Sequence, residues 1–188
     1  MRPYTKKIWT YFTENLGTTI IHPHFSLLKL QREVIDEVKT YLKSKGRTNL
    51  VDIGCGRMPY RSELEPLVST YIGVDHPEVS KLYPGSKPEI LADAKKLPFK
   101  ENSFDMALLL KVLEHVDSPE KVIKEASRVL KPNGVLIISV PFFYPLHDMP
   151  HDFGRYTESA LRYFISCSNL RLVKIKTQGS FLRPGCNF

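Results

Sequence analysis

The stretch Val51-Asp52-Ile53-Gly54-Cys55-Gly56 joins a short apolar run directly to a pair of glycines. Such a pair lets the backbone turn sharply and lets a ligand approach closely, because neither glycine carries a Cβ. Further along the chain, a second apolar run ends in Asp75. A carboxylate at the end of a strand can accept hydrogen bonds from both hydroxyls of an adenosine ribose, whereas the structural alternative is a tight turn followed by a helix cap. Together the two features favour a cofactor that contains adenosine.

The residues after the glycine pair distinguish between such cofactors. Dinucleotide-binding turns follow the pattern G-x-G-x-x-G, but Pro59 occupies the third glycine position here. Proline lacks the N–H that a pyrophosphate would use, and it cannot give the close packing of glycine. A nicotinamide dinucleotide is therefore disfavoured. S-adenosylmethionine has no phosphate and fits a shorter turn preceded by an acid, here Asp52.

Strand-like and helix-like segments alternate along the chain. Strands are expected at Leu50–Ile53, Tyr71–Val74, Ile90–Ala92, Met106–Leu110, Val135–Val140 and Leu172–Thr177. Helices are expected at Leu27–Lys45, Tyr60–Leu67, Val79–Tyr83, Pro119–Leu130 and Thr157–Ser166. This alternation predicts an α/β fold of the Rossmann-like, doubly wound kind, with a mostly parallel sheet, helices on both faces and ligands at the carboxyl ends of the strands.

Length and composition are those of one ordinary globular domain. The chain has 188 residues, of which 42% are hydrophobic and 25% charged, and it has no apolar run near the ~18 residues that a membrane-spanning helix needs. We expect an N-terminal helical segment over residues 1–48 that covers the site, and a main domain over residues 49–188 that carries the glycine turn. The start of the chain lacks the apolar core of a signal peptide, which predicts a cytoplasmic protein.

Charge and cysteine content add little about function. The net charge of +7 is compatible with an anionic substrate or a membrane surface, although solvated helix faces are the commoner cause. Cys55, Cys167 and Cys186 form neither a disulfide framework nor a metal-binding pattern. Cys55 is expected to be a small packed residue within the glycine turn.

Three further motifs point to one family. They are Leu91–Asp105 (LADAKKLPFKENSFD), Val112–Val116 (VLEHV) and Arg128–Gly134 (RVLKPNG). Together with the glycine turn and the strand that ends in Asp75, they resemble the class I S-adenosylmethionine-dependent methyltransferases of the type 11 family, in the order and spacing of that family. The resemblance runs from Val51 to Gly134, a little under half of the chain.

The resemblance implies S-adenosylmethionine as cofactor and S-adenosylhomocysteine as product. In the family pattern the glycine turn contacts the methionine part, the acid of the second strand holds the ribose, and the residues after the third strand meet the adenine between Leu97 and Phe99. The residues after the fourth strand lie near the sulfonium. The implied cofactor-binding residues are Asp52, Gly54, Cys55, Gly56, Asp75, His76, Asp93, Ala94, Lys111 and Val112. Asp105 opens the fourth strand at the opposite edge, so it is expected to be structural.

A second cluster of polar and aromatic residues follows the fifth expected strand, over residues 141–157. Loops at this edge of the sheet usually build the acceptor site. Its pattern, P-x-H-x-x-P-x-D-x-x-R-Y-T, resembles a subgroup of the family associated with bacterial surface-polysaccharide and other glycan pathways. Candidates for a general base are His147, His151 and His115, and candidates for acceptor binding are Phe143, Tyr144, Arg155 and Tyr156.

Each part of this cluster has a competing explanation. Glu114 and His115 could instead be caps and orienting groups of the next helix. An Asp152–Arg155 pair and a buried Tyr156 could simply hold the loop. His147, Asp148, His151 and Asp152 have metal-ligand chemistry, but Pro150 between the histidines does not favour helical ligand spacing, so no metal is predicted.

The sequence therefore predicts methyl transfer to a small-molecule or glycan acceptor, most simply O-methylation. The alternatives are a cofactor-binding module without catalysis and an RNA methyltransferase. The segment Leu110–His115 lacks the Asn/Asp-Pro-Pro-aromatic signature of enzymes that methylate base amino groups, so no nucleic acid is expected. The family sheet normally ends in a hairpin, for which residues 179–188 are a poor match. We therefore expect a sheet without its final strand, or a homodimer through that edge.

Overall fold

The computed structural model describes residues 6–13, 23–78, 85, 87–142 and 144–178. Its centre is a seven-stranded sheet in the order β4-β3-β2-β5-β6-β1-β7, in which every pair of neighbours is parallel. The strands are β1 (Lys6–Thr13), β2 (Asn49–Ile53), β3 (Thr70–Asp75), β4 (Ile90–Leu91), β5 (Phe104–Leu110), β6 (Leu130–Pro141) and β7 (Leu170–Gln178).

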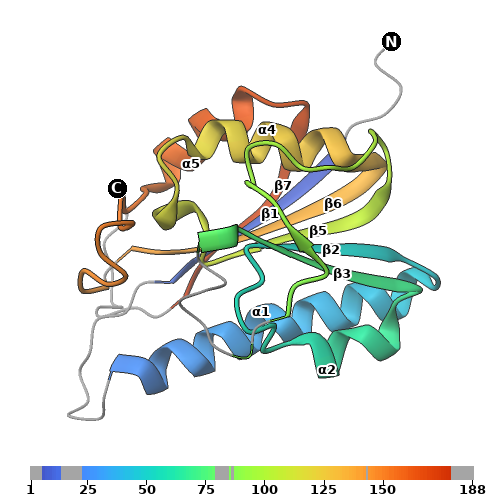
Figure 1. Ribbon diagram of the computed structural model, residues 1–188, viewed down its shortest axis with the longest axis horizontal. Coiled ribbons are helices and arrows are strands. Elements are labelled where there is room, and N and C mark those ends of the chain that lie inside the picture. Colours follow the sequence, from blue (N-terminus) through green and yellow to red (C-terminus); the bar gives the residue numbers. More distant parts are fainter. Residues whose placement is uncertain (1–5, 14–22, 79–84, 86, 143, 179–188) are drawn as a thin grey trace, which may run out of the picture.

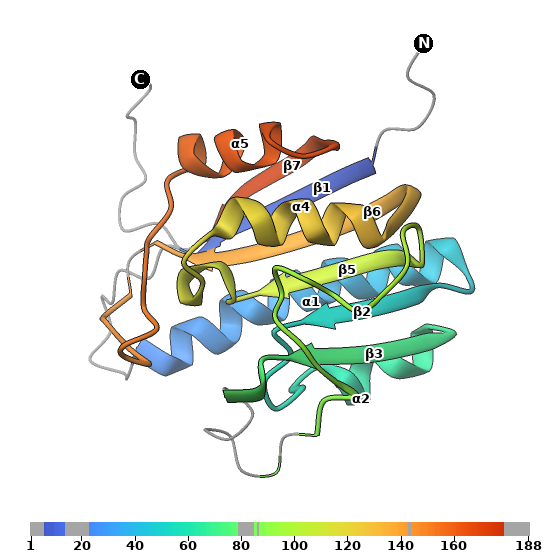
Figure 2. The same cartoon turned by 45° about the horizontal axis from the view of Figure 1, so that its top comes forward.

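Helices cover both faces of this sheet (Figures 1 and 2). One face carries α1 (Pro23–Lys45) and α2 (Arg61–Leu64), and the other carries α4 (Pro119–Val129) and α5 (Glu158–Ser166). Two short 3₁₀ turns, η1 (Glu65–Leu67) and η2 (Leu113–His115), complete the elements. The expected Rossmann-like, doubly wound α/β fold is confirmed.

The core consists of one apolar cluster on each face of the sheet. Central strands such as β6 are buried on both faces, which is why they are continuous apolar runs rather than alternating ones. In α4, the buried residues Val122, Ile123, Ala126 and Val129 recur at helical spacing and pack against one face. In α1, Val34, Ile35, Val38 and Leu42 do the same on the other.

The N-terminal strand departs from the sequence-based expectation. Residues 1–48 were expected to be helical, but Lys6–Thr13 form β1, which lies between β6 and β7 and is parallel to both. Strand β1 brings the sheet of the described residues to seven strands, whereas the expectation of a missing final strand concerns the end of the chain and stays a prediction. Residues 179–188 lie outside the described residues, and the homodimer through the sheet edge remains an expectation.

Smaller differences occur at element ends. The helix expected over Tyr60–Leu67 is divided into α2 and η1, and Pro66 lies in the first turn of η1. Strand β6 begins at Leu130, directly after α4, rather than at Val135. The helix expected over residues 79–83 lies outside the described residues. Among the described helices, none is long and apolar enough to cross a membrane.

Candidate active site

The glycine turn after β2 is built into the fold by close contacts. Gly54 and Gly56 have φ angles of +70° and +52°, in the left-handed region that favours glycine. The amides of Gly54 and Cys55 donate hydrogen bonds to the Val74 carbonyl at 2.8 and 3.1 Å. A Cβ added to Gly54 would lie 2.5 Å from a methyl group of Val112. The turn therefore packs directly against the segment that follows β5.

Asp75 ends β3 beside this turn and is almost fully buried. Its Oδ2 accepts a hydrogen bond from the Gly56 amide at 2.8 Å, and its Oδ1 accepts one from the His76 amide at 2.7 Å. Burial raises the pKa of this carboxyl, and the two amide hydrogen bonds oppose the rise. Asp75 thus stabilises the glycine turn itself. Its predicted contact with the ribose remains compatible with this, because each oxygen keeps a further lone pair.

Asp52 lies deeper, at 3% exposure. The Tyr71 hydroxyl donates a hydrogen bond to its Oδ2 at 2.5 Å. Burial raises the pKa of Asp52 to about 6, the Tyr71 hydrogen bond opposes this, and the negative charge of Asp75 adds to it. Its predicted contact with the methionine part stays a prediction. The sequence did not indicate Tyr71 as its partner, since the pairing joins two strands.

Asp93 follows β4 and is the most accessible of the three acids, with 43% of its side chain exposed. Its Oδ1 accepts a hydrogen bond from the Lys95 amide at 2.8 Å. Leu97, expected to lie against the adenine ring, is buried in the core at 4% exposure, with Phe99 packed partly against the same cluster. The adenine contacts of Asp93 and Ala94 stay predictions.

These residues share one edge of the sheet because their strands are neighbours. The order β4-β3-β2-β5 brings together the residues that follow each of these four parallel strands. The glycine turn, the ends of β3 and β4, and Lys111 with Val112 after β5 all lie there. Asp105 opens β5 at the opposite edge, where Lys131 and the Asn49 amide contact its carboxylate. This agrees with its expected structural role.

A second group of polar residues begins just past Val112, in η2. Glu114 is 1% exposed, and neither of its carboxylate oxygens has a hydrogen-bond partner among the described residues. Burial raises the pKa of Glu114 and lowers the pKa of Lys111, while the attraction between the two opposes both shifts. The sequence analysis did not identify Glu114 as the centre of this group of polar residues. The only available signal was an acid within the apolar segment Val112–Val116.

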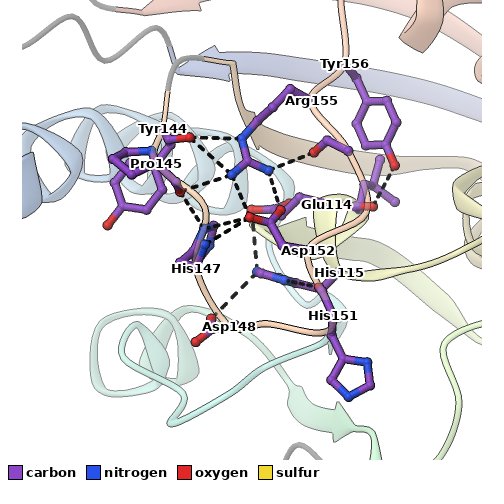
Figure 3. A network of polar contacts seen from close by, with 12 residues as sticks. Glu114, His115, Tyr144, Pro145, His147, Asp148, His151, Asp152, Arg155 and Tyr156 are labelled. Atoms are coloured by element: carbon purple, nitrogen blue, oxygen red, sulfur yellow. Dashed lines mark hydrogen bonds and ion pairs between the residues drawn. The ribbon is translucent and has the colours of Figure 1, made fainter.

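Two of the three candidate histidines meet at Glu114. The rings of His115 and His147 make an edge-to-face contact with centroids 4.9 Å apart. One ligand atom from each of Glu114, His115 and His147 lies within 4.8 Å of the others. The backbone carbonyl of His151 contacts His115 Nδ1 at 2.8 Å, but the His151 ring points away from the group, as Figure 3 shows. Only His115 and His147 therefore present their rings to Glu114.

The loop between β6 and α5 is held by Arg155 (Figure 3). Its guanidinium donates hydrogen bonds to both Asp152 oxygens and to the carbonyls of Tyr144, Pro145 and Gly154. Arg155 holds the pKa of Asp152 well below its usual range. The acceptor-binding role of Arg155 stays a prediction, and its contacts are those of the structural alternative.

The other acceptor-binding candidates also differ in whether their contacts hold the loop or lie beside Glu114. The Tyr156 hydroxyl donates a hydrogen bond to the Leu113 carbonyl at 3.1 Å, which joins the loop to η2. The Tyr144 ring makes an edge contact with the His147 ring, with centroids 4.8 Å apart. Phe143 lies outside the described residues. The His147 side of the loop is thus the part that adjoins Glu114.

Comparison with known proteins identifies the main domain. A family model described as a methyltransferase domain matches residues 51–138. Over these residues, a little under half of the chain, the sequence is similar to the class I S-adenosylmethionine-dependent methyltransferases. The domain contains the glycine turn, all three acids, Glu114 and His115, whereas His147 and the rest of its loop lie beyond the matched residues.

Relatives of this methyltransferase domain differ in their acceptors. A ubiquinone biosynthesis O-methyltransferase of Pelagibacter ubique is 30% identical over 126 residues, which cover 58% of this chain and 50% of that protein. A tRNA (carboxymethyluridine(34)-5-O)-methyltransferase of Arabidopsis thaliana is 32% identical over 126 residues, which cover 64% of this chain and 30% of that protein. The chain therefore spans about half or less of the length of these relatives. Neither name concerns glycans, so the glycan subgroup gains no support.

A solved structure supports the fold. The YcgJ protein of Bacillus subtilis superposes with a TM-score of 0.56 at 21% identity, over 72% of this chain and 67% of that chain. At this identity the likeness concerns the fold alone. The family relation, rather than the superposition, therefore supplies the cofactor, S-adenosylmethionine.

Proposed function

We propose that this protein transfers the methyl group of S-adenosylmethionine to a hydroxyl group of a small-molecule or glycan acceptor. The observation that carries the proposal is the contact between Gly54 and Val112. It fixes the start of η2 against the turn that the family uses for the methionine part of the cofactor. Glu114 and His115 follow two and three residues later, which supports a position of their side chains near the reacting methyl group.

The chemistry is a single displacement. The acceptor oxygen forms a bond to the methyl carbon while the carbon–sulfur bond breaks, and the sulfonium becomes the neutral thioether of S-adenosylhomocysteine. The sulfonium is intrinsically reactive, so most of the catalysis is positioning of the two reactants. The hydroxyl proton must also leave. The side chains that can assist this step are Glu114 and His115, which follow Val112 in the chain, and His147, whose ring contacts the ring of His115.

The loop over residues 144–157 supplies one wall of the acceptor site in this proposal. Leu146, Met149 and Phe153 are large apolar side chains on it that are more than half exposed. An acceptor with an apolar part would cover them. His147 lies between these residues in the chain and faces Glu114, which supports a role in the acceptor site. His151 was a third candidate base, and its outward ring makes it the matched control.

The test is a methyl-transfer assay with radiolabelled S-adenosylmethionine and a panel of acceptors. The panel contains phenols and catechols, nucleotide sugars, lipid-linked glycans, small carboxylic acids and RNA. We expect S-adenosylhomocysteine to form only with a hydroxylated acceptor. His147→Ala should lower kcat/KM by about 10²-fold, in the range of a lost proton-transfer or positioning group, and His151→Ala should change it little.

Other outcomes point to the alternatives. Turnover with RNA alone would replace the small-molecule acceptor by a nucleic acid, a possibility that the similarity to a tRNA methyltransferase keeps open. Binding of S-adenosylmethionine without turnover on any acceptor of the panel would indicate a cofactor-binding module. Equal losses in the two histidine variants would contradict the assignment of His147.

A further inference from the structure

We infer that Glu114, His115 and His147 form a binding site for a divalent transition-metal ion, with Asp148 at its edge. Their ligand atoms lie within 4.8 Å of one another, and they come from two segments, η2 and the loop after β6. Two imidazole nitrogens and one carboxylate oxygen are a ligand set that suits ions such as Zn²⁺, Co²⁺ and Fe²⁺. The inference concerns what the cluster binds, so it does not depend on the acceptor of the methyl group.

Glu114 is the first reason for this inference. A carboxylate taken out of water needs a cation or hydrogen-bond donors, because an unsatisfied buried charge is costly. Glu114 is 1% exposed, and its two oxygens accept no hydrogen bond from the described residues. A metal ion at the cluster would supply the missing partner.

The orientation of the two imidazoles is the second reason. His115 Nδ1 lies 2.8 Å from the His151 carbonyl, and His147 Nδ1 lies 3.1 Å from the Pro145 carbonyl. A carbonyl oxygen can only accept, so each Nδ1 must carry the proton, and each neutral ring then has its lone pair on Nε2. Metal-binding histidines are typically oriented in this way, through an N–H that donates to a backbone carbonyl or a carboxylate.

The Nε2 atom of His115 faces further oxygen ligands. It lies 4.0 Å from Glu114 Oε1 and 3.9 Å from Asp148 Oδ2. Asp148 is about half exposed, so it could approach an ion from the solvent side. Asp152, which a sequence-based ligand set would include, is instead paired with Arg155. Of the set of His147, Asp148, His151 and Asp152 that the sequence suggested as an alternative, the cluster contains His147, with Asp148 at its edge.

Two protein cations also lie near Glu114. Lys111 and Arg155 both interact electrostatically with its carboxylate. The donors of Arg155 are used by Asp152 and by loop carbonyls. Lys111 is therefore the side chain that would compete with a metal for Glu114. This competition gives a test that a purely structural cluster would not pass: removing the charge of Lys111 should strengthen metal binding.

The test is a titration of the full chain with Co²⁺, followed by visible absorption, with Zn²⁺ as competitor. We expect one Co²⁺ per chain and displacement by Zn²⁺. Glu114→Gln and His147→Gln should each weaken Co²⁺ binding by at least about 10-fold, the effect expected when a metal ligand or a group that orients one is lost. Lys111→Gln should tighten it several-fold. His151→Ala, in the same loop, should leave it unchanged.

Several results would overturn the inference. These are no Co²⁺ binding by the wild-type chain, Co²⁺ binding as tight as that of the wild type in Glu114→Gln and His147→Gln, or a loss in His151→Ala as large as theirs. If Glu114→Gln does not fold, the partly exposed His147 still provides the test. S-adenosylmethionine binding by the Glu114, His147 and His151 variants, measured by calorimetry, shows whether the domain is intact, and circular dichroism gives the same control for Lys111→Gln. Because that binding is scored separately, failure of the metal site and failure of the proposed methyl transfer give different results.

Discussion

The Gly56 amide donates a hydrogen bond to Asp75 Oδ2 at 2.8 Å. The glycine turn after β2 and the acid that ends β3 are thus one structural unit, although they lie on different strands. Because the same carboxylate is expected to hold the ribose, cofactor binding and the conformation of the turn depend on a shared group. Variants of this unit should therefore be followed by both stability and cofactor affinity.

The two glycines of the turn should differ in their tolerance of a side chain. Gly54→Ala introduces a left-handed alanine that clashes with Val112, and we expect the free energy of unfolding to fall by about 2–4 kcal/mol. A Cβ at Gly56 meets no atom within 4 Å, so Gly56→Ala should cost only about 1–2 kcal/mol. Urea denaturation measures both.

Val112→Ala tests the cause of that difference. It removes the methyl groups that a Cβ at position 54 would contact, so Gly54→Ala should cost less in the Val112→Ala background than in the wild type. A penalty that is the same in both backgrounds would contradict the packing of the turn against the segment after β5.

Asp52 should make stability depend on pH. Its pKa is raised from 3.8 to about 6, so between these values the folded protein keeps a proton that the unfolded chain releases. The free energy of unfolding should then fall as the pH rises through this window, by about 3 kcal/mol in total. Asp52→Asn can still accept from Tyr71 but does not titrate, and its advantage over the wild type should grow by most of that amount from pH 4 to pH 7. If the difference in free energy of unfolding between the two proteins is constant across this range, the pKa of Asp52 is not raised in the folded protein.

Arg155 should act mainly on the stability of its loop. Arg155→Ala removes hydrogen bonds to Asp152 and to three carbonyls, and we expect a loss of about 1–3 kcal/mol in the free energy of unfolding together with faster proteolysis of residues 144–156. Arg162→Ala breaks an exposed i,i+4 pair with Glu158 and should change little. An unchanged stability with a raised KM for the acceptor would instead support the acceptor-binding role.

The shared sheet edge of the glycine turn and the acids was predictable because its signals are local. A glycine pair directly after an apolar run, and acids at the ends of Tyr71–Asp75 and Ile90–Asp93, need only the rule that parallel strands place their carboxyl ends at one edge. The helices α4 and α5 were predictable for the same reason, since Pro119 and the capping Thr157 mark their first turns.

The features that were missed depend on contacts between distant segments. Strand β1 is paired with residues more than a hundred positions away, and no local pattern shows where a strand will be inserted in a sheet. The meeting of Glu114 with His147 depends on how the loop after β6 folds over η2. The outward ring of His151 depends on the same loop, so sequence spacing alone could not separate the two histidines.

The central claim is that one edge of the sheet binds S-adenosylmethionine through Asp75. The most direct measurement is calorimetric titration of the full chain and of two matched charge-neutral variants, Asp75→Asn and Asp105→Asn, at opposite edges of the sheet. We predict one site in the wild type, affinity lowered by about 10- to 150-fold in Asp75→Asn, and unchanged affinity in Asp105→Asn. No binding by the wild type, or equal affinities in the two variants, would contradict it.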